Sequence, residues 1–324
     1  MFIIVSSNFF YGSFRGLKAD LRDYSAYESI FIQVIHNGLD SFGRVYGEHG
    51  YIFVNWVFSQ ASHSYIYFRF IYYAIFLYAL FWLLLKDKRY VNFKALLYMT
   101  LFFYIDIVLL RYFAATVFFV WSIYLFYRKK YALTFIFILM GSFFHIAVVS
   151  TCLVYFLYYL DRRYQIKGTF YIFSIFIFLA LSSVGFGNRA SEVLIDLEIW
   201  RVSDQLKIYT QSKWSDSQGV LRGSVFLQLF FFILITFAYK LNRVNDNSFL
   251  RICYLSFYCG ISFILLFNDF GIISDRINFL LIHPVIFLIP SIFLVFKSDD
   301  RPLVNVILAF VCSFVIYFFS YRGL

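Results

Sequence analysis

One stretch of the chain restricts its fold more than any other. Residues 95–127 form a 33-residue apolar run that holds only two charged residues, Asp106 and Arg111. A helix needs about 20 apolar residues to cross a membrane, so this run is too long for one crossing and fits two. Arg111 then lies near the turn between the crossings. Because arginine stays charged, that position is costly unless a partner or water meets the side chain.

Apolar runs recur from end to end, which predicts a membrane protein with many crossings. The chain is 62% hydrophobic and 14% charged, whereas soluble domains are nearer half apolar and a quarter charged. The runs lack the period-two alternation of barrel strands. They predict an all-α polytopic protein, a single integral membrane domain over residues 1–324 with about ten or eleven transmembrane helices. The expected segments are a short one at 2–14, then 65–85, 95–110, 112–127, 131–160, 168–185, 223–239, 252–267, 277–296 and 302–320.

Lysine and arginine in the short connectors predict the orientation. The basic connectors are 86–94, 128–130, 161–167, 240–251 and 297–301. Together they carry 15 Lys/Arg and 5 Asp/Glu, a net charge equal to the +10 of the whole chain. The two long polar stretches, 15–64 and 186–222, are balanced, with 9 basic and 10 acidic residues. By the positive-inside rule the connectors face the cytoplasm and the long stretches form extracytoplasmic loops. The charge is thus a topology signal, and no nucleic-acid partner is expected.

The segment 131–160 lies between two basic connectors, so a single crossing would put one of them outside. Thirty residues span about 45 Å as a helix, more than a bilayer core. Two short passes that turn near Gly141–His145 satisfy the charge rule. This arrangement places His145 on the outer side, or at the bottom of a cavity open to it.

With this topology, otherwise isolated polar residues fall on one side of the membrane. Arg111 and His145 lie at outer turns, and the others lie in outer loops or connectors: Arg15, Asp20, Tyr24, Glu48, Arg222, Asp269, Asp275 and Arg276. Charged residues at membrane depth face an aqueous cavity by default. A guanidinium fork matches phosphate oxygens. Several arginines at one cavity would therefore suit a pyrophosphate or another anionic group.

Each of these residues also has a structural interpretation. Arg111 and Asp106 could form a structural ion pair, and His145 could be a core histidine that donates to a carbonyl. Asp20 could be an ordinary loop or cap residue. The histidine spacing fits no metal site, and no phosphate-binding glycine loop is present, so neither a metal nor a cofactor is expected.

Four short patches and their order resemble the EpsG-like branch of the bacterial polysaccharide polymerases, the O-antigen (Wzy-type) polymerases. The first patch runs from Arg15 through Asp20 to Tyr24, and the second is Gly-Glu-His-Gly-Tyr at 47–51. The third is Leu-Arg-Tyr-Phe-Ala at 110–114, and the fourth begins with Phe-Phe-His at 143–145. Ser-Asp-Arg-Ile at 274–277 also fits the pattern. The resemblance covers most of the chain.

The resemblance implies a glycosyltransferase at the outer face of the bacterial cytoplasmic (inner) membrane. It would join oligosaccharide repeat units carried on undecaprenyl pyrophosphate, with a chain-length regulator protein as a further partner. In this scheme arginines take the role of a metal. Arg111 and Arg276 would hold the pyrophosphate with help from Arg15, and His145 or Asp20 would act as the base or position the acceptor. The remaining substrate-binding residues would be Asp275, Tyr24, Glu48 and Arg222.

Other functional classes stay open at this point. An O-antigen ligase is also an outer-face transferase with arginines and a histidine, but it would transfer to lipid A core. A lipid-linked oligosaccharide flippase belongs to a class that expects short loops and internal repeats. The two long polar stretches and the lack of a visible repeat argue against a flippase. A membrane acyltransferase is a further alternative.

Overall fold

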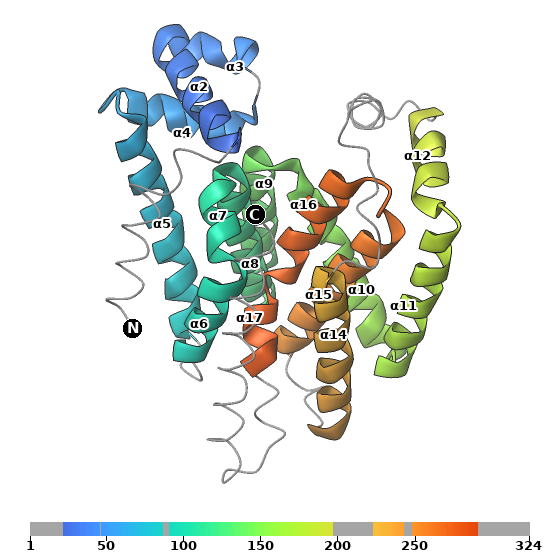
Figure 1. Ribbon diagram of the computed structural model, residues 1–324. Coiled ribbons are helices and arrows are strands. Elements are labelled where there is room, and N and C mark those ends of the chain that lie inside the picture. The colour runs from blue at the N-terminus through green and yellow to red at the C-terminus, as the bar shows by residue number, and fades with distance from the viewer. Residues whose placement is uncertain (1–21, 46, 87–90, 197–222, 243–247, 291–324) are drawn as a thin grey trace. The chain divides into compact units, whose positions relative to one another are not determined.

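The computed structural model describes residues 22–45, 47–86, 91–196, 223–242 and 248–290. Within these ranges every regular element is a helix, as Figure 1 shows, which confirms the all-α prediction. The chain divides into two compact units. One comprises residues 1–149 and 297–324, and the other comprises residues 150–296.

Several helices are long and apolar enough to cross a membrane, so the protein is a polytopic membrane protein. Three of them have at least 18 residues: α5 (Tyr65–Lys86), α8 (Leu110–Tyr127) and α15 (Ser248–Leu266). Shorter apolar helices are α9 (Tyr131–Phe144), α11 (Gly168–Ser183) and the part of α14 (Gly223–Asn242) up to Phe237. Large aromatic side chains such as Phe135, Phe173 and Phe230 are exposed on these helices, as expected for surfaces that meet lipid.

The first unit is built on α8, which packs along α9 and against α5. Aromatic rings fill the space between these helices. Tyr73 stacks on Phe113 with ring centroids 4.9 Å apart, and Phe76 contacts Phe144 edge-on at 5.7 Å. This packing fixes the start of α8 and the end of α9, which carry Arg111 and His145.

The predicted first loop is mostly helical where the structure describes it, and its helices gather at one end of α5 (Figure 1). These elements are α2 (Arg22–Asn37), η2 (Gly38–Asp40), α3 (Ser41–Arg44) and α4 (His49–Ser59). Val34, Val45 and Ile52 form a small buried core between them. Tyr24, Tyr27 and the following apolar residues of α2 recur at helical spacing, which explains why this polar stretch folds as a helix.

The predicted crossing over 95–110 is wrong as a single helix. α6 (Val91–Leu101) ends before Phe102, α7 (Phe103–Val108) is short, and α8 follows directly. Side chains of α5 donate to two carbonyls at the junction between α7 and α8, where the last carbonyls of α7 lack intrahelical partners. Nη2 of Arg69 donates to the Ile107 carbonyl at 2.7 Å, and the Tyr72 hydroxyl donates to the Leu110 carbonyl at 3.2 Å.

The predicted break near Gly141–His145 is confirmed. α9 ends at Phe144, and His145 has an extended backbone (φ −159°, ψ 123°). The chain continues through η3 (Ile146–Ser150) to α10 (Thr151–Tyr164) in the second unit. The assignment of this segment to two separate passes stays a prediction.

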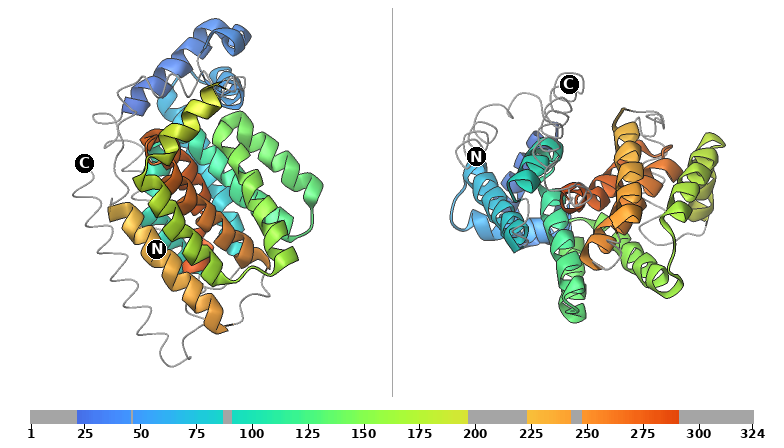
Figure 2. Two further views of the ribbon diagram at one scale, coloured as in Figure 1. Left: turned by 90° about the vertical axis from the view of Figure 1, so that its right-hand side faces the viewer. Right: turned by 90° about the horizontal axis from the view of Figure 1, so that it is seen from below.

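The second unit is built around α15, which packs against α10, α11, α14 and α16 (Figure 2). The described part of this unit also includes α12 (Phe186–Asp196) and α17 (Val285–Leu288), and α16 spans Gly271–Ile282. α16 ends at Ile282 and α17 begins at Val285, so the helical segment is interrupted at Pro284, as proline commonly causes. Almost every side chain of α15 is buried.

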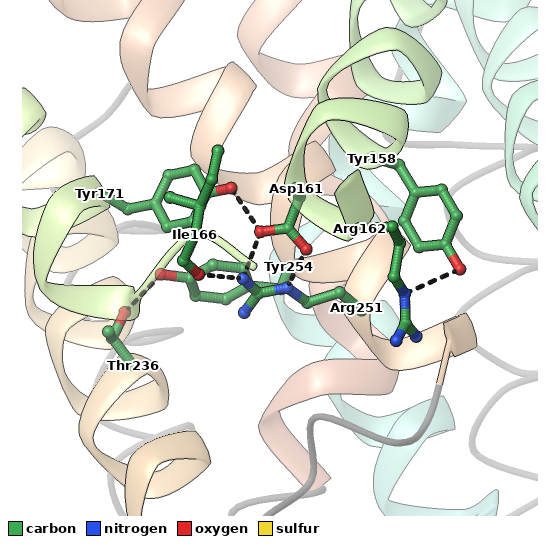
Figure 3. Close-up of polar contacts among 8 residues, drawn as sticks. All are labelled: Tyr158, Asp161, Arg162, Ile166, Tyr171, Thr236, Arg251 and Tyr254. Atoms are coloured by element: carbon green, nitrogen blue, oxygen red, sulfur yellow. Dashed lines mark hydrogen bonds and ion pairs between the residues drawn. The ribbon is translucent and has the colours of Figure 1, made fainter. Parts of the chain in front are cut away.

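A buried ion pair joins α15 to α10 in this unit (Figure 3). Nε of Arg251 donates to Oδ2 of Asp161 at 2.9 Å, and its Nη2 donates to Oδ1. The Tyr171 hydroxyl donates to Oδ1 of Asp161 at 2.7 Å, and Arg251 also donates to the Ile166 carbonyl at 3.1 Å. Asp161 and Arg251 belong to two connectors that were both predicted to be cytoplasmic. Their contact agrees with the prediction that the two connectors lie on one side.

Candidate functional site

Arg111 and Glu48 form an ion pair in the first unit. Arg111 is the second residue of α8, at the predicted helix break, and its Nη1 contacts Oε2 of Glu48. The Arg111 side chain is 17% exposed and that of Glu48 is 25% exposed. Asp106 is fully buried beside Tyr98. The carboxylate that faces Arg111 is therefore Glu48, and the alternative pair with Asp106 is wrong.

Gly50 allows Glu48 to reach this position. Glu48 is the N-cap of α4, and Gly50 lies in the first turn against the last turn of α9. A Cβ atom at Gly50 would lie 2.8 Å from the carbonyl oxygen of Phe143, closer than any real Cβ contact. Only glycine permits this approach of α4 to the α9 backbone. The glycine in the Gly-Glu-His-Gly-Tyr patch is thus a packing requirement that positions the carboxylate.

Tyr27 lies against the Arg111 guanidinium and packs on Tyr51. Cζ of Arg111 lies 5.3 Å from the ring centroid of Tyr27, which contacts the Tyr51 ring edge-on at 5.5 Å. Tyr51 is fully buried, and burial raises its pKa, so its hydroxyl stays protonated. Tyr27 was not predicted as a site residue from the sequence. Its position three residues after Tyr24, on the same face of α2, was the available signal.

Arg69 is a buried arginine in this unit that was not predicted as a site residue from the sequence. Its side chain is 6% exposed, and its Cζ lies 4.9 Å from the ring centroid of Tyr24. Burial raises the pKa of Tyr24. Arg69 is the one charged residue inside the predicted crossing 65–85, and such a charge is expensive in a membrane. This cost was the sequence signal that could have identified Arg69.

His145 lies beside the residue that follows Arg111. Its ring contacts Tyr112 at 5.6 Å with an interplanar angle of 81°. Nδ1 of His145 accepts a hydrogen bond from the Ala147 backbone N–H at 3.2 Å. In neutral imidazole one nitrogen accepts and the other carries the proton. The neutral His145 ring therefore holds its proton on Nε2.

The second unit holds two other predicted site residues, but the prediction that they lie in a connector is wrong. Asp275 and Arg276 belong to α16, which starts at Gly271, before the apolar part of the segment. The backbone N–H of Ser274 donates to the Phe270 carbonyl at 2.9 Å, so the helix extends into the predicted connector. Asp269 lies in the remaining connector, where its Oδ2 accepts from the Asn188 backbone at 3.1 Å.

Three predicted site residues, Arg15, Asp20 and Arg222, lie outside the described residues, so their roles stay predictions. The first unit brings together Tyr24, Glu48, Arg111 and His145 from four different segments. Among the described residues, this end of the unit holds the partly exposed Arg111, the buried Arg69 and the carboxylates of Glu48 and Asp106. Such a set can bind an oxyanion and orient a sugar hydroxyl.

Comparison with known proteins gives one finding. A family model described as the EpsG family matches residues 1–323, which is nearly the whole chain. No curated protein and no solved structure matches it.

Proposed function

The chain belongs to the EpsG family, whose members are Wzy-like polysaccharide polymerases, and on that premise we propose that it joins lipid-linked oligosaccharide repeat units. The units would be carried on undecaprenyl pyrophosphate. The reaction would take place at the outer face of the bacterial cytoplasmic membrane. The observation that carries this proposal is the convergence of Arg111, Glu48 and His145, which are far apart in the sequence, at one end of the first unit.

The reaction needs two kinds of assistance, and the site offers groups for both. A sugar hydroxyl of the incoming unit attacks the anomeric carbon of the growing chain and forms the new glycosidic bond. The bond from that carbon to the lipid pyrophosphate breaks, and its electron pair leaves on the pyrophosphate. Arg111 stabilises the charge that develops there. Arginines supply this stabilisation, so the mechanism we propose uses no metal.

Of the two roles predicted for His145, general base or acceptor-positioning group, the hydrogen bond at its Nδ1 favours the second. A neutral His145 with its proton on Nε2 is a donor, so it orients the acceptor sugar or the leaving oxygen. The proton of the attacking hydroxyl then passes to a different group. Asp20 takes that base role in the proposal. The other proposed substrate-binding roles stay with Arg15, Tyr24, Glu48, Arg222, Asp275 and Arg276.

The orientation of the chain follows from its charge and can be tested directly. In a cysteine-free background, His63→Cys precedes α5 on the proposed outer side, and Arg163→Cys lies in a basic connector. Both positions are exposed. A membrane-impermeant maleimide should label His63→Cys in intact cells and Arg163→Cys only after permeabilisation. The reverse pattern would put the site on the cytoplasmic side.

The decisive experiment is extension of a synthetic undecaprenyl-pyrophosphate repeat unit by the purified protein. A ladder of products is expected from the wild type, and Arg111→Lys and His145→Ala should each reduce it strongly. Near-normal ladders from both variants at normal protein levels would contradict the proposed roles of Arg111 and His145. A protein that moves the lipid-linked unit across vesicles without extending it would be a flippase. One that transfers polymer only to lipid A core would be a ligase.

A further inference from the structure

Two arginines of the first unit, Arg69 and Arg111, each have a buried N–H group that no described residue accepts. Nη1 of Arg69 and Nε of Arg111 are buried and find no hydrogen-bond partner among the residues that the structure describes. A buried donor without a partner costs free energy, more so when it is charged. Arg251 in the second unit is different, since its Nε and Nη2 bond to Asp161 and a carbonyl. Among the arginines that the structure describes, Arg69 and Arg111 are the ones with a buried donor that has no partner.

Both arginines lie at the same point of the fold, the junction of α7 and α8. Arg69 donates through Nη2 to the Ile107 carbonyl, and Arg111 follows four residues later at the start of α8. They also share a cover. Tyr24 and Tyr27, one turn apart on α2, lie over Arg69 and Arg111 respectively. A ring over the face of a guanidinium leaves the N–H groups at its edge available.

Arg69 and Arg111 differ in whether a carboxylate neutralises their charge. Arg111 is already paired with Glu48. Arg69 has no carboxylate within ion-pair distance in the part of the chain that the structure describes. A buried cation without a counter-ion needs an anion. Arg69 is therefore the member of this arginine pair whose charge no described ion pair neutralises.

We infer that Arg69 and Arg111 together form a binding site for a phosphate oxyanion beneath α2, with Nη1 of Arg69 and Nε of Arg111 as donors. This inference rests on the proposed function in one respect, since it assigns the oxyanion to the diphosphate of the lipid-linked substrate. The head group of a bilayer phospholipid carries the same chemistry. The tests below separate these two sources.

Binding to the purified full-length protein in neutral nanodiscs tests the inference without turnover. The probes are inorganic pyrophosphate, farnesyl pyrophosphate and nanodiscs that contain phosphatidylglycerol, and the readout is the shift in the thermal unfolding midpoint. Pyrophosphate should stabilise the wild type, and Arg69→Gln should weaken its affinity about tenfold or more, the worth of one charge-assisted hydrogen bond. Stabilisation by both diphosphates supports the lipid-linked substrate as source. Stabilisation by phosphatidylglycerol alone supports the site with a phospholipid as its occupant.

Tyr72→Phe is the matched control for a purely structural role of Arg69. It removes the other side-chain hydrogen bond to the same junction but leaves the charge in place. Tyr72→Phe should keep wild-type pyrophosphate affinity. If Arg69→Gln does not fold, Arg69→Lys decides, because it keeps the charge and loses the fork, and an affinity about tenfold weaker is expected. Wild-type affinity in the Arg69 variant that folds would overturn the inference.

The outcomes also separate this inference from the proposed function. If the wild-type protein binds pyrophosphate through Arg69 but does not extend repeat units, the proposed function alone would be contradicted. Normal extension by Arg69→Gln with unchanged pyrophosphate affinity would contradict the inference alone.

Discussion

The Arg111 guanidinium contacts the carboxylate of Glu48, which lies 63 positions earlier in the chain. The contact ties the start of α4 to the start of α8, at the break where the sequence had placed an unexplained charge. It also means that Arg111 enters any reaction as half of a pair. A change at either residue alters both the net charge and the packing of the site.

Reversing the pair separates its structural and chemical roles. Glu48→Arg or Arg111→Glu alone should destabilise the protein by about 1–3 kcal/mol, because each leaves two like charges facing one another in a partly buried place. The double variant, Glu48→Arg with Arg111→Glu, restores opposite charges, so folded protein in the membrane should recover. Polymer should stay absent, because the cation is displaced from α8. Polymer at wild-type levels in the double variant would mean that the pair acts only as a structural link.

Gly50 should tolerate no side chain. Gly50→Ala places a Cβ 2.8 Å from the Phe143 carbonyl, so α4 must move away from α9. We expect a loss of about 1–3 kcal/mol, the usual cost of overpacking, and a marked drop in polymer because Glu48 moves with α4. Gly43→Ala is the control, since a Cβ there meets nothing within 4 Å. Thermal unfolding and polymer yield of the two variants should diverge, and equal behaviour would contradict this view of Gly50.

The sequence predicted the helical membrane class and the break before His145, because these follow from apolar run length and charge placement. It also placed Arg111 at a helix break. It could not identify the partner of Arg111, because Asp106 is close in sequence and Glu48 reaches the site only through tertiary packing. Arg69 was missed because its segment is otherwise a clean apolar crossing. Asp275 and Arg276 were placed in a connector because hydropathy marks where a helix becomes apolar, and α16 starts earlier.

His145 should act through Nε2, and two amide substitutions distinguish its nitrogens. The amide of Gln can place a donor near the position of Nε2, whereas the shorter Asn can replace only the acceptor that Ala147 uses. His145→Gln should therefore retain roughly tenfold more extension activity than His145→Asn, the value of a hydrogen bond of about 1.4 kcal/mol. The initial rate of repeat-unit extension at equal protein levels measures this. Greater activity in the Asn variant would assign the role to Nδ1.

Tyr51 should limit stability in alkali. Burial raises its pKa in the folded protein above the value of 10.0 for an exposed tyrosine. Its stabilising effect is therefore complete below pH 10 and is lost as the pH rises, because the unfolded chain ionises first. Its hydroxyl makes no hydrogen bond of ordinary geometry to the described residues, so Tyr51→Phe should change stability at pH 7 by only about 0–1 kcal/mol, toward greater stability.

Unfolding midpoints measured between pH 8 and pH 11 check the Tyr51 prediction. The decline above pH 10 should be shallower in Tyr51→Phe than in the wild type. Tyr67→Phe is the control, because Tyr67 is 61% exposed, and it should decline like the wild type. Identical alkaline profiles for all three proteins would contradict the prediction.

Asp161 should be essential for the stability of the second unit and dispensable for the chemistry. Asp161→Asn leaves Arg251 buried and without its counter-ion, at a cost of about 3–5 kcal/mol. Adding Arg251→Gln removes the stranded charge, so the double variant should be more stable than Asp161→Asn alone. Arg162→Ala, next in the chain but exposed, should change stability by about 0.5 kcal/mol or less. Extension activity per folded molecule should stay near the wild-type value in all three, because none of these side chains belongs to the proposed site. A selective loss of activity in the double variant, with folded protein at normal levels, would instead place the Asp161–Arg251 pair in the reaction.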